Sequence, residues 1–426
     1  MTNNYQSTAT PTLRFPEFRG GEQWKTAPLG AIAERVSTKN TDGSVTRVLT
    51  NSAERGVLDQ RDYFDRDIAT AGKVDGYYVV DQGDYVYNPR TSVIAPVGPI
   101  SRNNVGKGVM SPLYTVFRFS AEKTDFYEHY FKSTAWHSYV RSAASTGARH
   151  DRMSITTGAF MRMPVPTPDS SEQQKIADCL TSLNKVIAVQ GRKVEALKAH
   201  KRGLTQQLFP REGETLPRLR LPEFRDGPEW TTHPFEHFIG RSFYGTSSST
   251  SEKGQYPVLR MGNMVDGTLD FSNMAYIDLD RESFDAFRLM RGDILLNRTN
   301  SMDLVGKISL FDLDLECITA SYIVAHRLDK ERLDPSFCNF MLNTPQYQAK
   351  IKAFARPSIS QANINPTTFR KELNVSVPSL AEQQRIADSL SGLDDQIAAE
   401  SEKFNALKTH KKGLMQQLFP LPEVSP

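Results

Sequence analysis

Two stretches of the chain lack acidic residues and carry side chains that could bind a nucleic acid. The first stretch lies between Asp84 and Glu122 and includes Arg90, Thr91 and Ser92. Its other basic residues are Arg102, Lys107 and Arg118. Lys and Arg neutralise phosphates, and Arg, Asn and Gln form paired hydrogen bonds with base edges. The position of Arg118, directly after the apolar pair Val116 and Phe117, favours a structural role.

The second acid-free stretch lies between Asp334 and Glu372. Its polar and basic residues include Lys350, Lys352, Arg356, Ser358, Ser360, Gln361, Asn363, Asn365, Arg370 and Lys371. The loop from Ser145 to Arg152 is its counterpart in the first part of the chain and includes Thr146, Arg149 and His150. Loops rich in Ser, Asn and Gly are common, so these stretches alone leave base reading open.

The sequence contains no residue motif that predicts a catalytic site. The sequence has no Gly-x-x-x-x-Gly-Lys-[Ser/Thr] phosphate loop. It also has no Asp-Pro-Pro-Tyr-like string of an amino-methyltransferase, and Asn88-Pro89-Arg90 is one of the two nearest strings. Cys317, His326 and Cys338 lack metal-ligand spacing, which predicts core positions and no metal site. The sequence therefore favours binding over chemistry.

Two segments of the sequence recur. Residues 13–19 (Leu-Arg-Phe-Pro-Glu-Phe-Arg) return at 219–225 as Leu-Arg-Leu-Pro-Glu-Phe-Arg, and Trp24 returns as Trp230. Residues 172–210 match residues 382–420 at 23 of 39 positions, which excludes chance. The blocks between them match weakly, although Gly83-Asp84 resembles Gly292-Asp293. Both Gly-Asp pairs predict turns before the strands Tyr85–Tyr87 and Ile294–Leu296. We therefore expect one scaffold used twice with different surface loops.

The longer repeat predicts a helix of about 37 residues in each half. Apolar residues recur at spacings of three and four, which is the a/d pattern of a coiled coil. The seam positions predicted to pair the helices or dock a partner are Leu180, Leu183, Ile187, Leu197, Leu390, Leu393, Ile397 and Leu407. Asp169 and Ser379, each followed three residues later by Glu, predict capping boxes. Pro210 and Pro420 should end the helices, and ordinary core helices remain the alternative.

Composition narrows the class of protein. The chain has 426 residues, 52 Lys and Arg, 49 Asp and Glu, and a net charge of +3, which excludes a polycationic tail protein. No window approaches the roughly 18 apolar residues of a membrane helix. The polar N-terminus and three widely spaced cysteines predict a cytoplasmic protein that does not contact a membrane.

The order of these motifs resembles the DNA-specificity (S) subunit of type I restriction–modification systems. The resemblance rests on the Leu-Arg-Phe-Pro-Glu-Phe motif, a variable block, and a Glu-Gln-Gln-Lys-Ile-Ala-Asp helix ending in Gln-Gln-Leu-Phe-Pro, all occurring twice. It covers nearly the whole chain. It is more specific in the helices than in the variable blocks.

The resemblance implies an α/β (α+β) architecture with two target recognition domains. Two long helices would form an antiparallel coiled coil with a pseudo-twofold internal repeat. The implied segments are a disordered tail (1–12), recognition domain 1 (13–168), helical spacer 1 (169–210), recognition domain 2 (211–378), helical spacer 2 (379–420) and a C-terminal tail (421–426).

The resemblance also implies function and partners. Each recognition domain would read one half of a bipartite, asymmetric sequence in double-stranded DNA. The helices would set the half-site spacing and dock two modification subunits, which carry S-adenosylmethionine and methylate adenine N6. Restriction subunits would bring ATP and Mg. This chain itself would bind no cofactor and would not be an enzyme.

The DNA-binding residues that the resemblance implies fall on four segments. In the first block they are Arg90, Thr91, Ser92, Thr146, Arg149, His150 and Arg152. In the second block they are Arg298, Thr299, Asn300, Ser301, Lys307, Arg356, Ser358, Ser360, Gln361 and Asn363. The first block departs from the family pattern by an inserted Pro89 and by lacking a Lys after Gly98.

Two other functions compete with DNA recognition. A coiled-coil scaffold without sequence-specific DNA binding would also need the long helices. A stand-alone DNA methyltransferase is disfavoured by the missing cofactor and amino-transfer motifs.

Overall fold

The computed structural model of the chain describes residues 8–63, 74–145, 151–358 and 361–420. The chain divides into two compact units. Unit 1 comprises Met1–Gln190 and Lys403–Pro426, and unit 2 comprises Gly191–Glu402. In the described part, no helix is long and apolar enough to span a membrane.

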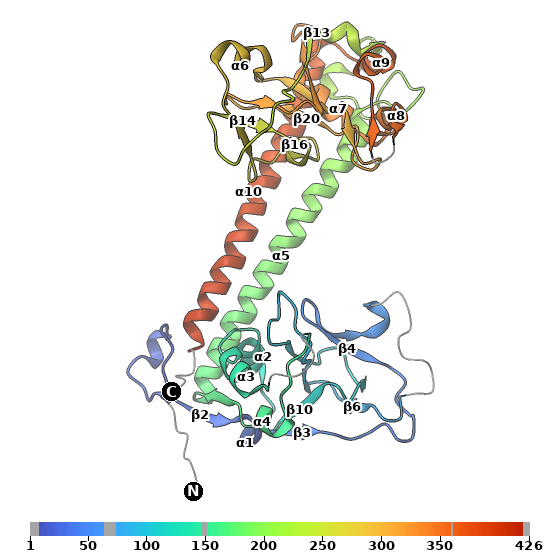
Figure 1. Cartoon of the computed structure of the whole chain (residues 1–426). Helices are drawn as coiled ribbons and strands as arrows, with labels where there is room; N and C mark the ends of the chain where they lie inside the picture. The colour runs from blue at the N-terminus through green and yellow to red at the C-terminus, as the bar shows by residue number, and fades with distance from the viewer. Residues whose placement is uncertain (1–7, 64–73, 146–150, 359–360, 421–426) are drawn as a thin grey trace. The chain divides into compact units, whose positions relative to one another are not determined.

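A four-stranded antiparallel sheet forms the centre of unit 1 (Figure 1). Its order is β3 (Ala33–Val36), β10 (Thr115–Phe119), β7 (Tyr85–Tyr87) and β8 (Ile100–Arg102). The helices of the same unit are α1 (Leu29–Ile32), α2 (Asp125–Phe131), α3 (His137–Ala143) and α4 (Thr157–Met161). Buried aromatic rings fill the core; for example, Tyr87 stacks on Phe160 with centroids 4.6 Å apart.

Smaller sheets surround this core. A three-stranded sheet pairs β1 (Thr8–Ala9) and β11 (Pro164–Thr167) with β2 (Trp24–Pro28). β4 (Leu49–Ser52) and β5 (Gly56–Asp59) form a hairpin, and β6 (Tyr78–Val80) pairs with the more distant β9 (Gly108–Met110). Thr8 pairs with Lys25, so the prediction of a disordered tail over residues 1–12 is wrong for β1, because backbone pairing orders it. The predicted C-terminal tail, 421–426, lies outside the described residues.

Unit 2 also has a four-stranded antiparallel sheet. Its order is β13 (Ile239–Tyr244), β22 (Ile323–Leu328), β18 (Asp293–Asn297) and β20 (Ile308–Phe311). Its helices are α6 (Arg281–Phe287), α7 (Pro335–Leu342), α8 (Pro345–Ala353) and α9 (Pro366–Glu372). Its remaining strands are β12 (Thr231–Pro234), β14 (Tyr256–Leu259), β15 (Met264–Val265), β16 (Thr268–Leu269), β17 (Ala275–Ile277), β19 (Thr299–Asn300), β21 (Ile318–Thr319), β23 (Arg356–Pro357), β24 (Ala362–Asn363) and β25 (Asn374–Val377). The mixed helix and sheet class predicted from the sequence is confirmed.

The two long helices are α5 (Ser170–Leu208) and α10 (Leu380–Leu418), each of 39 residues. Both begin one residue after the predicted cap and end two residues before the predicted proline stop. Each helix contributes to both units, because unit 1 holds the start of α5 and the end of α10, and unit 2 holds the rest. Within unit 2, Lys193 pairs with Glu400 and Lys201 with Asp394, which joins the two helices.

The repeated Leu-Arg-x-Pro-Glu-Phe motif anchors to these helices in both units. In unit 1, Arg14 donates two hydrogen bonds of 2.7 Å to the buried carboxylate of Glu172. In unit 2, Arg220 donates bonds of 2.9 and 2.8 Å to Glu382. The sequence predicted these Glu residues as capping-box partners, but a buried carboxylate gains more from a charged donor. The donor lies 158 or 162 residues away in the sequence.

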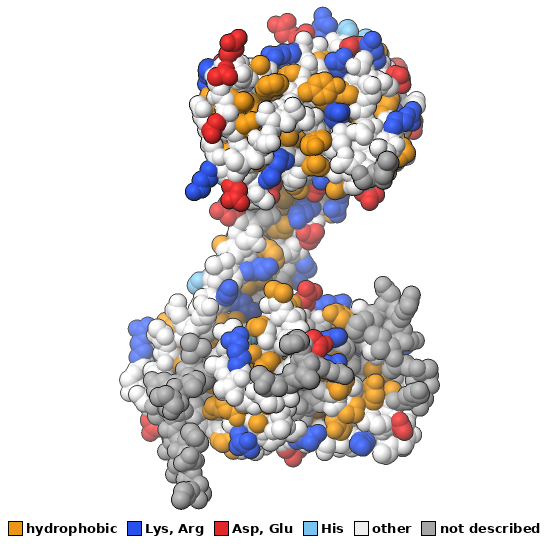
Figure 2. Space-filling model, viewed as in Figure 1, with side chains coloured by type: hydrophobic (Ala, Val, Ile, Leu, Met, Phe, Trp, Pro, Cys, Tyr) orange, Lys and Arg blue, Asp and Glu red, His pale blue; other side chains and the backbone are white. Residues whose placement is uncertain are grey.

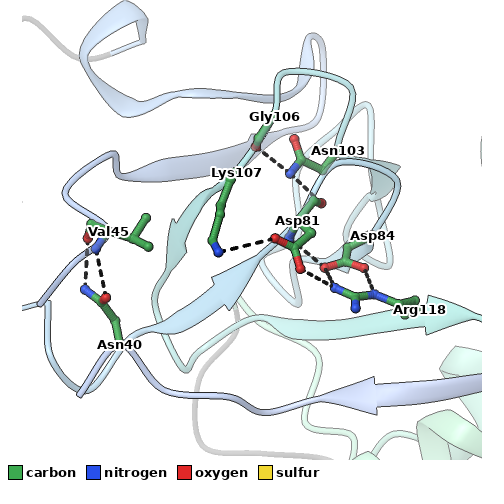
Figure 3. Close-up of polar contacts among 8 residues, drawn as sticks. All are labelled: Asn40, Val45, Asp81, Asp84, Asn103, Gly106, Lys107 and Arg118. Carbon is green, nitrogen blue, oxygen red and sulfur yellow. Dashed lines mark hydrogen bonds and ion pairs between the residues drawn. The ribbon is translucent and has the colours of Figure 1, made fainter. Parts of the chain in front are cut away.

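A second shared contact fixes the strands that lead to the candidate site. As Figure 3 shows, Arg118 donates to Asp84 over 2.6 Å and also bonds Asp81. In unit 2, Arg327 pairs in the same way with the buried Asp293. Gly83 and Gly292 precede the Asp residues with φ of +94° and +99°, so the predicted Gly-Asp turns are confirmed. The structural role predicted for Arg118 is confirmed too.

Candidate nucleic-acid interface

Unit 2 brings its two predicted DNA-binding segments together. The chain leaves β18 and enters β19, which pairs with β24, and β24 pairs with β23. Thr299 therefore faces Asn363, and Arg356 faces Asn363 from the other side. Segments about 60 residues apart in sequence form a single small three-stranded sheet at the end of the main strand.

Hydrogen bonding orients the side chains at this sheet. The buried Thr299 donates its hydroxyl hydrogen to the Asn363 amide oxygen over 2.7 Å. This bond fixes the orientation of the Asn363 amide, whose side chain is half-buried. A fixed amide suits base reading, because discrimination needs a donor and an acceptor held in one geometry.

Arg298 lies beside the same sheet and stacks on an aromatic ring. Its guanidinium carbon is 5.5 Å from the ring centroid of Tyr244, which is 49% exposed. The backbone amide of Arg298 donates to the carbonyl of Tyr322, another exposed aromatic residue. No sequence motif marks either tyrosine, because the end of β13 and the residue before β22 reach Arg298 only after the sheet has formed.

The remaining predicted residues of the second segment differ in their exposure. Arg356, Ser358 and Gln361 are exposed, and the Ser358 amide donates to the Gln361 carbonyl over 2.6 Å. Asn300 is half-buried and Ser301 is exposed. Ser360 lies outside the described residues.

Lys307 lies apart from this sheet. Its ammonium donates to the carbonyl of Met264 over 3.1 Å, and the side chain is half-buried. A lysine committed to a backbone carbonyl is a weaker candidate for a phosphate contact than the exposed Arg356.

Unit 1 joins its own two predicted segments in a similar way. Arg90 and Arg152 face each other in an isolated antiparallel bridge. The Thr91 amide donates to Asp151, and the Met153 amide donates to Pro89, each over 2.9 Å. Predicted residues Thr146, Arg149 and His150 lie outside the described residues.

An acidic residue lies between the two arginines of unit 1. Asp151 is 3.6 Å from the Arg90 guanidinium and 4.0 Å from that of Arg152. Exposed ion pairs of this kind contribute about 0–1 kcal/mol, so a phosphate can compete for these arginines. Asp151 therefore weakens the basic character of this surface without removing it.

A cavity of about 210 Å³ lies beside these arginines. Arg90, Thr91, Ser92 and Arg152 line it together with residues that the sequence analysis did not single out. These additional residues include Thr50, Asn51, Ser52, Tyr63, Asn88 and Tyr114. They come from β4 and neighbouring loops, which no local motif marks as functional.

One lining residue of this cavity has an unused acceptor. The Asn51 amide nitrogen donates to the carbonyls of Val86 and Pro99 over 2.8 and 3.2 Å. Its amide oxygen is buried and has no hydrogen-bond partner among the described residues. Thr50 and Tyr114 share a 3.2 Å hydrogen bond on the same lining. The polar lining of unit 1 thus differs from the Arg–Tyr–Asn arrangement of unit 2.

The predicted seam residues of the long helices divide into two groups. Leu180 and Leu390 are fully buried and belong to the cores of unit 1 and unit 2. The others are half-buried: Leu183, Ile187, Leu197, Leu393, Ile397 and Leu407. Leu180 and Leu390 thus stabilise their own units, which leaves other positions to meet a partner.

The described residues can be compared with the requirements of a metal site and of an activated thiol. There, no group of three or more His, Cys, Asp and Glu residues is placed to hold a metal ion. Burial raises the pKa of Cys317 and of Cys338, so neither thiol is activated.

The fold has a counterpart among solved structures. The S subunit of a type I restriction–modification system from M. genitalium superimposes with a TM-score of 0.56. The two chains are 12% identical, and the match covers 96% of this chain and 99% of the other. At this identity the likeness concerns the fold alone.

Sequence comparisons find similarity to one family of proteins. Residues 239–409 match the type I restriction modification DNA specificity domain. Over 176 residues, 41% of each chain, the protein is 28% identical to the MjaX type I restriction enzyme specificity subunit of Methanocaldococcus jannaschii. It is 21% identical to the MjaVIII specificity subunit of the same organism over 66% of each chain. The chain is thus similar to type I specificity subunits, and the match with the MjaX subunit covers 41% of that relative.

Proposed function

We propose that this chain is the DNA-recognition subunit of a type I restriction–modification complex. Each unit reads one half of a bipartite, asymmetric DNA sequence. The observation that carries this proposal is that both units gather two distant polar segments at one place, on equivalent supports, with different side chains. Similar main sheets that carry different polar segments suit a DNA target whose two halves differ in sequence.

The long helices supply the second part of the proposed function. Their ion pairs within unit 2 and their half-buried apolar seams support an antiparallel coiled coil, with a pseudo-twofold relation between the halves. The helix pair sets the distance between half-sites and docks two modification subunits. Val186 and Val189 of α5 are 47% and 56% exposed, and such apolar positions suit a partner helix.

The chain acts without catalysis of its own. Adenine N6 methylation uses S-adenosylmethionine on the modification subunits, and restriction uses ATP and Mg on restriction subunits.

Mapping of N6-methyladenine in the host genome, with and without this gene, tests the proposal. One gapped, asymmetric motif should lose its methylation when the gene is deleted. Exchanging residues 13–168 for those of a relative should change one half of the motif, and exchanging 211–378 should change the other. Unchanged methylation in the presence of an expressed modification subunit would instead favour a scaffold without sequence-specific DNA binding.

A further inference from the structure

A basic cavity of about 570 Å³ opens in unit 1 where α5 and α10 meet the segment after α2. Four lysines line it: Lys132, Lys408, Lys411 and Lys412. The rest of the lining combines polar side chains with the apolar Ile187, Met415 and Phe419. Lys and Arg side chains are visible on the surface of the long helices in Figure 2. A cavity that combines apolar walls with several ammonium groups is built for a ligand that is both anionic and partly apolar.

Lys411 differs from the other three lysines of this cavity because it is half-buried, whereas Lys132, Lys408 and Lys412 are exposed. Lys132 pairs with Glu128 over 2.6 Å, and Lys408 lies 5.0 Å from the Phe404 ring centroid. Lys411 is half-buried, and no carboxylate of the described residues lies within ion-pair distance of it. Burial lowers the pKa of Lys411, and the neighbouring Lys132 ammonium lowers it further. A half-buried ammonium without a counter-charge is costly, and a bound anion removes that cost.

The corresponding lysine of unit 2 has the partner that Lys411 lacks. Lys201 occupies the same place in the repeated helix sequence, and both carboxylate oxygens of Asp394 accept from its ammonium over 2.6 Å. Its ammonium also lies 4.9 Å from the ring centroid of Phe340. The position that corresponds to Asp394 in α5 is Asn184, which lines the cavity beside Lys411. Unit 1 thus keeps the lysine of this pair and replaces its aspartate with a neutral amide.

From this contrast we infer that the cavity binds the carboxylate of an acidic side chain on a partner protein. The partner segment inserts that side chain between α5 and α10 and packs apolar neighbours on Ile187, Met415 and Phe419. The inference rests on the proposed function, and within it the partner is a modification subunit. Unit 2 satisfies its lysine internally with Asp394, so Lys201 takes no part in binding the partner's carboxylate.

A protein segment fits the cavity better than the DNA backbone does. Phosphate contacts come mainly from exposed Lys and Arg, which neutralise charge while staying hydrated. Here the critical ammonium is half-buried, and Met415 and Phe419 on the lining are buried. A single acidic side chain can reach such a recessed ammonium, whereas a sugar–phosphate chain would follow the exposed surface.

Three substitutions in the full-length chain test the inference by calorimetric titration with the modification subunit. Asn184→Asp supplies an internal carboxylate, as Asp394 does in unit 2, and should weaken binding about 10- to 100-fold. Lys411→Ala should weaken binding to a similar extent, because the partner's carboxylate loses its counter-charge. Lys201→Ala is the matched control: it breaks an intrachain pair and should lower the Tm without weakening binding.

The outcomes separate this inference from the proposed function. If the wild-type chain does not bind the modification subunit at all, the proposed function fails. If the wild type binds and both Asn184→Asp and Lys411→Ala bind equally well, the inference is overturned. Loss of DNA affinity in Lys411→Ala, with unchanged subunit binding, would assign the cavity to phosphate instead. Tighter binding by a chain that ends at Pro420 would assign it to the chain's own terminal residues.

Discussion

In unit 1, Arg90 and Arg152 face each other across an isolated bridge, and in unit 2, Thr299 and Asn363 pair within a three-stranded sheet. Both arrangements follow a strand held by a buried Asp–Arg pair. The two units share the strand and its Asp–Arg pair, whereas the exposed side chains after the strand differ. This contrast suggests that the supports serve folding and that the divergent loops serve target choice.

The Arg14–Glu172 and Arg220–Glu382 pairs differ in one hydrogen bond. This difference predicts the largest change in the free energy of unfolding. Glu172 accepts from Arg14 and also from the Trp24 indole N–H over 3.0 Å. The indole nitrogen of Trp230 is buried and has no hydrogen-bond partner among the described residues. Arg220→Ala should therefore destabilise unit 2 by about 3 kcal/mol, because it leaves the Glu382 carboxylate buried without its charged partner.

Arg14→Ala is the comparison for that variant. It should cost less than Arg220→Ala, because the Trp24 hydrogen bond remains on Glu172. Urea unfolding of both variants, followed by fluorescence, measures the difference. An equal loss in both units would mean that the indole hydrogen bond does not protect the carboxylate.

The second prediction concerns base reading. Asn363→Ala should lose about 1–3 kcal/mol of discrimination, and only against duplexes altered in one half of the target. Thr91→Val should lose discrimination in the other half, because Thr91 lines the unit 1 cavity. Competition binding with duplexes changed in one half at a time measures both effects. If a substitution lowers the affinity for cognate and random DNA equally, that residue contacts phosphate and does not read a base.

The third prediction concerns pH, because each unit contains a buried histidine. Burial lowers the pKa of His129 to about 4 and that of His326 to about 3. The unfolded chain takes up these protons near pH 6.5, whereas the folded chain does not. Stability should therefore be full above pH 6.5 and fall below it, by up to about 1.4 kcal/mol per pH unit for each histidine.

Unfolding free energies measured between pH 7.5 and 4.5 test this dependence. His326→Gln should flatten the slope whatever its effect on absolute stability, since a glutamine cannot titrate. His129 shares a hydrogen bond with Thr181, and His326 shares one with Ser242. Because the two histidines have different partners, each can be replaced without removing the other's hydrogen bond. An unchanged slope in His326→Gln would show that carboxylates dominate the pH dependence.

The smallest effect is expected for the exposed ion pair between the helices. Lys193→Ala removes the pair with Glu400, and its side chain is 49% exposed. The loss should be below about 1 kcal/mol and should shrink further at high salt. Thermal unfolding at two salt concentrations measures it, and a loss as large as that of Arg220→Ala would contradict this ordering.

Local patterns in the sequence predicted the helices and the turns. The heptad spacing and the prolines predicted α5 and α10 to within two residues at each end, because helix periodicity and termination are local properties. The Gly-Asp pairs predicted turns for the same reason. The repeat also indicated which segments are scaffold and which are variable.

The sequence by itself determined the repeated segments, the long helices and the segments rich in side chains of the kinds that can bind DNA. Only the tertiary structure decided what those segments meet. It placed Tyr244 against Arg298, lined a cavity with Asn51, and gave Glu172 to Arg14 instead of to its own helix cap. These contacts join residues far apart in the chain. Strand pairing and tertiary packing select them, and no local pattern in the sequence records which distant residues will meet.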